Sequence, residues 1–504
     1  MLYDVFALKK RSGAVEASLV AAAWAAARLV WPPSGYNTHA IMYPVVEAAG
    51  GYNTLEPFHS LYPPLVALTR QCWERGRFAG PALPALQAVS LIAGAANLVL
   101  LHRAARRATG SLDAALGAAL IGAVSANLWA WSLMTTSYTL ATACLLAAAG
   151  RLLDRERLDP QDAAWTGLWV GLAAGFDAAA ACAALPAAYE LARRRAPHAR
   201  TAIQWAAFGG AFAAPAAIGL AVLARRLARM GWPFPPTPTG FIESLPGDIV
   251  PLWQSWDLTG QIRAWAVSQA PLDLPLWAAA AGILAAGAAA KNWSERALWR
   301  QGAAIWSLTS LFFFLNDPHN RFVYSGGLLL PAMFAAWAAR RGRPLAWSAA
   351  AALVLGVWHA VVPPQYFADH EIAGFAEARF LGGSLRAGDL LVALAEPDWT
   401  FSYAFARRAR VVRVGRPGEE ADRFGMEAAS GDELERKIDA VLCAGGQAVF
   451  AADAQFRPSQ LEPAALDEEA RVLFRRFSLR YRVVPAWISP GGQRYFPLRP
   501  RRCA

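Results

Sequence analysis

The feature that most constrains this chain is a series of apolar runs that recur through residues 1–365. A helix needs about 20 apolar residues to cross a hydrocarbon layer of about 30 Å. The chain is 56% hydrophobic and 17% charged, whereas soluble domains are about 25% charged. A purely soluble enzyme is therefore excluded. We predict eleven spans, near 14–32, 82–102, 112–132, 135–150, 162–176, 178–192, 202–224, 274–290, 301–316, 322–339 and 345–362.

The cations between these runs predict the orientation. Lys and Arg gather at 9–11, 103–107, 151–157, 193–200, 291–300 and 340–343, and such clusters favour the cytoplasmic side. With the N-terminus inside and eleven crossings, residues 366–504 lie outside, as do the loops 33–81 and 225–273. We expect a multi-pass protein of the cell inner (plasma) membrane. Because the cations separate apolar runs instead of forming one basic face, no nucleic-acid partner is expected.

The run 162–192 is too short for two full spans and too long for one. Cations on both sides of it favour the cytoplasm, so we predict two short helices bent around Gly175-Phe176-Asp177. A carboxylate at membrane depth is a functional candidate. Asp177 at the apex of a bend could instead be hydrated.

The sequence pattern changes after residue 366. Short β-like runs at 390–394, 411–414 and 448–450 alternate with charged helical stretches at 430–442 and 464–478, a pattern typical of an α/β domain. We therefore predict an all-α polytopic membrane domain over 1–365, followed by an extracytoplasmic α/β domain over 366–504. Five cysteines at irregular spacing indicate neither a metal motif nor a disulfide framework.

The first external loop is rich in polar and aromatic residues. It runs from Gly35-Tyr-Asn37-Thr-His39 through Tyr43, Glu47, Gly51-Tyr52, Glu56 and His59 to Tyr62-Pro63-Pro64-Leu65. This order resembles the first extracytoplasmic loop of polytopic GT-C glycosyltransferases, in which an acidic residue, a Tyr and a Gly-Tyr precede a Tyr-Pro-Pro-Leu that enters a helix along the membrane surface. Asn37 stands where the family has the acid.

Further stretches are similar to the bacterial protein O-mannosyltransferase-like branch of the GT-C superfamily. They lie at 129–140, 171–177, 316–322 and 388–403. The resemblance implies a GT-C-like membrane domain that transfers a sugar from a polyprenyl-phosphate-linked donor. The chain has no Gly-rich phosphate loop, His-Glu-x-x-His, Cys-x-x-Cys or Gly-x-Ser-x-Gly motif. We expect neither a metal nor a cofactor besides the donor lipid.

The resemblance also implies where a catalytic base would lie. In the family the loop acid takes the proton of the acceptor hydroxyl or holds a metal, and an amide such as Asn37 cannot accept that proton. His39 is one candidate base, because an imidazole has an ordinary pKa of about 6.5. Glu56 and Asp317 are the others, and Glu47 is a further carboxylate of the first loop. His39 could equally be a structural histidine and Glu56 a turn cap.

Arg321 is the leading candidate for binding the lipid phosphate. A guanidinium is always charged and matches phosphate oxygens bidentately, although a cation at a span boundary can also extend to the membrane interface for solvation alone. The other residues of the predicted substrate-binding set are Asn37, Tyr43, His59, Tyr62 and His319. For His59 the alternative role is ordering of the loop.

Two functions fit these observations. The first is a membrane glycosyltransferase whose partners are membrane lipid, a polyprenyl-phosphate-linked sugar and an extracytoplasmic glycan, lipid or protein acceptor. The second is a catalytically inactive GT-C-like binding or scaffold subunit of an envelope polysaccharide assembly system. Asn37 motivates it, as does Thr136, which stands where the similar stretch has a second acid. A transporter is disfavoured because paired interrupted helices are missing.

Overall fold

The computed structural model divides the chain into two units. One comprises Met1–Pro33, Glu56–Leu65 and Ala85–Gln365, and the other Ser34–Leu55, Val66–Pro84 and Tyr366–Ala504. The structure describes residues 2–30, 61–77, 83–132, 137–194, 198–229, 259–260, 262–263, 290, 292–316, 329–361, 380–381, 383–386, 388–393, 410–414, 427–429, 431–451, 472–473, 475–488 and 494–501.

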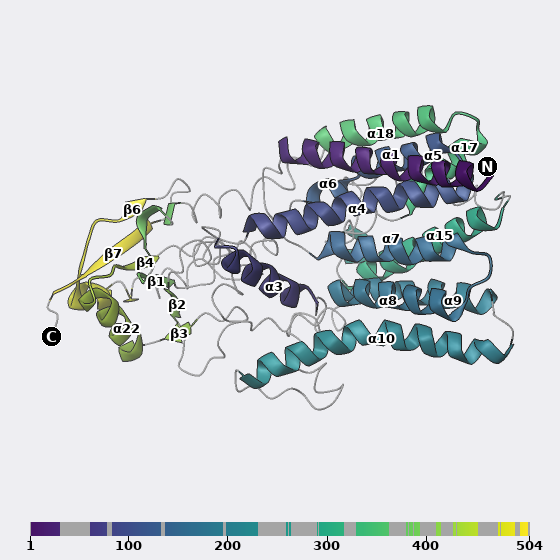
Figure 1. Cartoon of the computed structure of the whole chain (residues 1–504). Helices are drawn as coiled ribbons and strands as arrows, with labels where there is room; N and C mark the ends of the chain where they lie inside the picture. The colour runs from purple at the N-terminus through teal and green to yellow at the C-terminus, as the bar shows by residue number, and fades with distance from the viewer. Residues whose placement is uncertain are drawn as a thin grey trace. The chain divides into compact units, whose positions relative to one another are not determined.

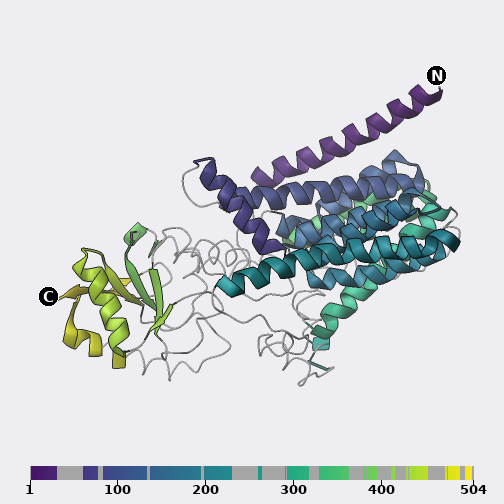
Figure 2. The same ribbon diagram turned by 60° about the horizontal axis from the view of Figure 1, so that its bottom comes forward.

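The first unit is a helix bundle whose members lie side by side in Figure 1, whereas Figure 2 shows the N-terminal end of α1 standing apart from the others. A further helix, α3 (Tyr62–Arg75), begins in this unit and continues into the second. The members of the bundle are α1 (Leu2–Val30), α4 (Leu83–Thr109), α5 (Leu112–Ala123), α6 (Ala126–Trp131), α7 (Tyr138–Asp154), α8 (Pro160–Phe176), the 3-10 helix η2 (Ala178–Ala183), α9 (Ala184–Arg193), α10 (His198–Arg229), α15 (Trp293–Asn316), α17 (Leu330–Arg340) and α18 (Pro344–Val361).

Within the described residues, two helical segments are long and apolar enough to cross a membrane, Ala85–Thr109 and Thr201–Gly219. Leu112–Ala123 and Pro344–Trp358 are apolar but shorter. The run 274–290 lies outside the described residues apart from Ala290. The number of spans therefore stays a prediction.

Two expected spans have a different local structure. The run 112–132 was expected as one helix, which is wrong, because it is broken between α5 and α6. The Ser125 hydroxyl donates to the Gly122 carbonyl at 2.8 Å and caps α6 by accepting from Leu128 N. The run 162–192 forms α8, η2 and α9 as two short antiparallel segments, which confirms the predicted bend at Asp177.

The helices are joined by tight turns at one end of the bundle. The turns at 110–111, 155–159 and 341–343 all lie there (Figure 1), and we call this the short-turn end. Asp159 begins α8 with a capping box, because its carboxylate accepts from Asp162 N at 2.8 Å and the Asp162 carboxylate accepts from Asp159 N at 3.3 Å. Gly342 adopts a φ of 79°, a conformation that favours glycine at a helix end.

Ion pairs fasten the helices at the short-turn end. The Glu190 side chain on α9 is fully buried and accepts from Arg300 Nε on α15 at 2.5 Å, while Arg194 Nη2 lies 2.5 Å from its second carboxylate oxygen. Arg340 at the end of α17 donates to Glu295 at the start of α15 at 2.6 Å. Charges withdrawn from water in this way are tolerated only when they are paired.

Glycines bring α8 and α10 into backbone contact. A Cβ atom added at Gly167 would lie 2.3 Å from the Phe208 carbonyl oxygen, and one at Gly171 would lie 2.3 Å from the Phe212 carbonyl oxygen. Such small-residue spacing is typical of helices that pack closely in a membrane. The absence of these two side chains therefore sets the distance between α8 and α10.

The second unit contains a seven-stranded mixed sheet. Its strand order is β3-β2-β1-β4-β7-β5, with β6 paired to β7; β1 to β4 are parallel and β7 is antiparallel to β4. Strands β2 and β4 contain the runs predicted at 411–414 and 448–450, and β1 covers 390–393 of the run predicted at 390–394. The strands are β1 (Leu390–Ala393), β2 (Arg410–Val414), β3 (Glu427–Ala429), β4 (Ala448–Ala451), β5 (Tyr481–Val483), β6 (Trp487–Ile488) and β7 (Arg494–Pro500).

One described helix of eight or more residues, α22 (Gly431–Cys443), packs on this sheet. Leu434 and Ile438 on its buried side join a core with Phe450 of β4 and Phe477. Cys443, the last residue of α22, is disulfide-bonded. The irregular spacing of the cysteines did not indicate this bond, because a single disulfide produces no regular pattern in the sequence.

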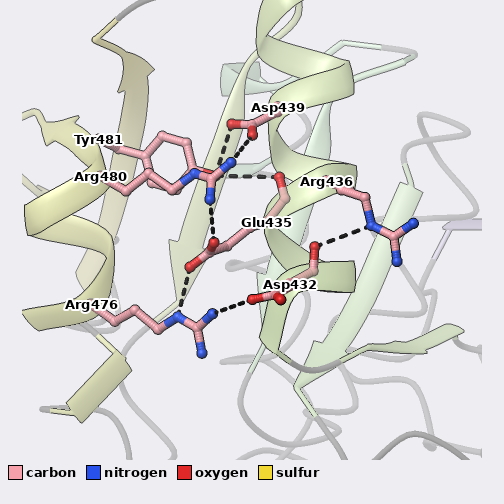
Figure 3. Close-up of polar contacts among 7 residues, drawn as sticks. All are labelled: Asp432, Glu435, Arg436, Asp439, Arg476, Arg480 and Tyr481. Carbon is pink, nitrogen blue, oxygen red and sulfur yellow. Dashed lines mark hydrogen bonds and ion pairs between the residues drawn. The ribbon is translucent and has the colours of Figure 1, made fainter.

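A polar network ties α22 to the helical segment 475–480 (Figure 3). The Glu435 carboxylate accepts from Arg476 Nε at 2.6 Å and from Arg480 Nη1 at 2.5 Å. The Tyr481 hydroxyl donates to Asp439 at 2.9 Å. Burial, reinforced by this hydrogen bond to Asp439, raises the pKa of Tyr481 above its ordinary value of 10.

Candidate functional site

Helices α1 and α15 end, and α17 begins, at the end of the bundle opposite the short turns, and we call it the long-loop end. Helix α15 starts at the short-turn end, where Asn292 donates to the Ala108 carbonyl at 3.2 Å, so its last residue, Asn316, lies at the long-loop end. Helix α17 ends at the short-turn end and therefore begins at the other. Both α1 and α15 thus lead into the connections 31–60 and 317–328 at the same end of the bundle.

Those two connections hold all but one of the predicted site residues. Asn37, His39, Tyr43, Glu56 and His59 belong to the first, and Asp317, His319 and Arg321 to the second. All eight lie outside the described residues. Their roles as base and phosphate ligand stay predictions. The bundle shows only that α1, α15 and α17, which flank the two connections, have their adjoining termini at the long-loop end.

Tyr62 is the predicted substrate-binding residue that the structure describes. It begins α3 and its side chain is only 1% exposed. The residue before it, Leu61, donates its backbone N–H to the Gly175 carbonyl at 2.8 Å, and a Cβ at Gly175 would lie 2.4 Å from the Leu61 side chain. Gly175 therefore lets the start of α3 seat against the end of α8. Burial raises the pKa of the Tyr62 hydroxyl, which keeps it a neutral donor.

Asp177 is buried at the same end of the bundle, between α8 and η2. Its Oδ1 accepts from the Ala179 backbone N–H at 2.9 Å, so it caps η2, and its own N–H donates to the Ala173 carbonyl at 2.8 Å. The alternative of a hydrated apex is therefore wrong. The carboxylate has a capping role that satisfies the orphan donors of a helix start.

Arg28 is a polar residue of this end that the sequence analysis did not single out. It lies two residues before the end of α1 and is fully buried. Its Nε donates to Ser132 Oγ at 3.1 Å, and its guanidinium carbon lies 4.2 Å from the centre of the Trp129 ring. The signal was present in the sequence, because an arginine inside an apolar run requires a specific partner.

The partners of Arg28 belong to the segment that resembles the GT-C stretch 129–140. The same segment is fixed by the Trp131 ring, which packs edge-on against Tyr138 at 4.9 Å. Nearby, Asn97 donates to the Thr139 carbonyl at 3.1 Å. Arg28 thus links the end of α1, where the first connection begins, to this segment. Thr136 lies outside the described residues.

The described part of the chain contains no group of three or more His, Cys, Asp or Glu side chains that could hold a metal ion. Its polar residues at the long-loop end are a guanidinium stacked on indole, hydroxyls and a capping carboxylate. Because Arg28 and Asp177 are buried, these groups can hold the helix ends that lead into the connections.

No protein-family model and no curated protein matches the sequence. The fold, however, is similar to solved structures. ArnT from Cupriavidus metallidurans bound to undecaprenyl phosphate aligns with a TM-score of 0.58 and 12% identity over 96% of this chain and 97% of that protein. The same ArnT in the apo state aligns with a TM-score of 0.55 and 11% identity, covering 99% of this chain and 98% of ArnT.

The oligosaccharyltransferase from Archaeoglobus fulgidus, in complex with zinc and sulfate, aligns with a TM-score of 0.47 and 11% identity over 97% of this chain and 73% of its own. ArnT and this oligosaccharyltransferase are GT-C glycosyltransferases. The two ArnT alignments extend over nearly the whole of both chains. They confirm, at the level of the fold, the resemblance seen in the sequence: this chain shares the fold of ArnT.

Proposed function

We propose that this chain is an integral membrane glycosyltransferase that moves a sugar from a polyprenyl-phosphate-linked donor to an extracytoplasmic acceptor. The observation that carries the proposal is the end-to-end likeness to ArnT bound to undecaprenyl phosphate. The long-loop end adds support. The helices that lead into 31–60 and 317–328, the two loops that contain the expected polar residues, terminate at that same end of the bundle.

In the proposed reaction the acceptor hydroxyl attacks the anomeric carbon of the donor and the lipid phosphate leaves. Arg321 binds the phosphate and neutralises the charge that develops on it. His39, Glu56 or Asp317 takes the proton of the hydroxyl. Arg28 acts indirectly, because it holds Trp129 and Ser132 against the end of α1, after which the first loop begins.

The first test measures donor-lipid binding without turnover. Undecaprenyl phosphate is titrated into the purified protein in detergent, and thermal stabilisation gives the dissociation constant. A charge-assisted hydrogen bond contributes about 1.5–3 kcal/mol, so Arg321→Ala should weaken binding about 10- to 100-fold. Arg343→Ala, at an exposed arginine of the short-turn end, is the matched control and should bind as the parent does. Equal binding by Arg321→Ala and the control would remove the phosphate role.

The second test measures turnover. Proteoliposomes receive radiolabelled polyprenyl-phosphate sugars and envelope acceptor extracts, beside His39→Gln, Glu56→Gln and Asp317→Asn. One of the three should abolish transfer while donor binding is retained. Binding by the parent without any transfer would favour the scaffold function, which the amide at Asn37 still motivates.

A further inference from the structure

The disulfide of α22 has one candidate partner in this chain. Cys443 is disulfide-bonded, whereas Cys72, Cys144 and Cys182 are free. The sequence has five cysteines, and the fifth is Cys503, which lies outside the described residues.

The sheet register supports the same pairing independently. Strands β4 and β7 are antiparallel, with Ala448 opposite Leu498. Cys443 precedes Ala448 by five residues, and Cys503 follows Leu498 by five. Because antiparallel strands place the start of one beside the end of the other, the chain leaves β7 at the edge where α22 delivers Cys443.

The connection between Cys443 and β4 is held in place on that edge. Gly446 N donates to the Val441 carbonyl at 2.9 Å, and Gln447 N donates to the Asp389 carboxylate at 2.8 Å. Gly445 has a φ of 83°, which ends the helix in the left-handed conformation. The position of Cys443 is therefore fixed by α22, the turn and β4. Its sulfur atom is held at the sheet edge from which the C-terminal segment leaves β7.

We infer that Cys443 and Cys503 form a disulfide and that the second unit matures in an oxidising compartment, outside the cytoplasm. The two thiols lose two protons and two electrons as the S–S bond forms, and a protein or small-molecule disulfide is reduced to two thiols. Cytoplasmic thiol systems keep such pairs reduced, whereas the periplasm and cell exterior allow them to persist. The bond ties down a C-terminal end that would otherwise fray.

This inference does not rest on the proposed function, and it bears on the side of the membrane independently of the charge clusters. Thiol counts require neither donor nor acceptor. A failure of the glycosyltransferase assay would therefore leave it intact, and a failure of the thiol counts would leave the lipid-binding test intact.

The first experiment counts thiols in the full-length protein. Cells are quenched in acid, the protein is denatured, and a maleimide–polyethylene glycol adds one mass step for each free thiol. The parent should show three steps before reduction and five after it, since two of its five cysteines are bonded. Cys443→Ser should show four in both conditions, and the control Cys72→Ser should show two and then four. Five steps in the unreduced parent, or a variant pattern that implies another pair, would overturn the inference.

The second experiment identifies the compartment. In cells that lack the periplasmic thiol oxidant, the parent should show five steps before reduction. In spheroplasts, a membrane-impermeant maleimide should label Cys503 in Cys443→Ser, whereas Arg343→Cys at the short-turn end should add no label until the membrane is opened. Persistence of the bond without the oxidant, or labelling with the two sides exchanged, would refute the extracytoplasmic placement.

Discussion

The contact between α8 and α10 makes a quantitative prediction about Gly171. An added Cβ would lie 2.3 Å from the Phe212 carbonyl oxygen and 3.0 Å from its carbonyl carbon. These are backbone atoms of a long helix, so they cannot rotate away as a side chain can. Relief requires the helices to separate locally by about 1 Å, and overpacking of this kind costs about 1–3 kcal/mol.

A matched control is available on the partner helix. Nothing lies within 4 Å of a Cβ added at Gly209, so Gly209→Ala should stabilise the protein by about 0.5–1 kcal/mol through helix propensity alone. Gly171→Ala gains the same propensity term and adds the overpacking. The difference between the two variants therefore isolates the close contact, and we expect it to be about 1–3 kcal/mol.

The assay is unfolding of the purified protein by increasing fractions of SDS in a mild detergent, followed by tryptophan fluorescence. Gly171→Ala should unfold at a lower SDS fraction than the parent, and Gly209→Ala at an equal or higher one. Gly167→Ala should behave as Gly171→Ala does, because its Cβ would also lie 2.3 Å from a carbonyl oxygen. If Gly171→Ala and Gly209→Ala unfold together, the backbone contact does not set the helix spacing.

The remaining predictions concern polar contacts. Glu190→Gln leaves two arginines without their carboxylate and should cost about 3 kcal/mol in the same SDS titration; an unchanged midpoint would contradict this. The raised pKa of Tyr481 means that its contribution to stability is complete below about pH 10 and is lost as the pH rises further. The thermal midpoint of the parent should accordingly fall more between pH 9 and 11 than that of Tyr481→Phe, and parallel curves would count against it. Arg28→Lys keeps the charge but loses the planar stacking on Trp129, so it should cost about 1–2 kcal/mol and less than Arg28→Ala; an unchanged midpoint in Arg28→Lys would show that stacking contributes nothing.

Sequence patterns predicted most helices of the bundle because burial and span length act over many residues. The bend at Asp177 was predicted from two flanking cation clusters, although its capping of η2 was not. The break at Ser125 was missed, since a serine that caps a short helix looks the same as any serine in an apolar run. Local hydrogen bonding decides such positions, and hydropathy does not report it.

The candidate site was less predictable than the fold. The role of Arg28 was not predicted, because its partners Trp129 and Ser132 are about a hundred residues away in sequence. The disulfide of Cys443 depends on a strand register that joins β4 to β7. Both are pairings between distant segments, which spacing along one chain cannot reveal.

The two ends of the bundle differ in how freely they can change. At one end, turns of a few residues are specified by a capping box, a left-handed glycine and buried ion pairs. An inserted residue there would disturb several helices at once. At the other end the connections are long, and loops of this kind tolerate insertion and substitution. Related proteins can therefore change their ligand preference through substitutions and insertions at the long-loop end. The packing at the short-turn end, on which folding depends, stays unchanged.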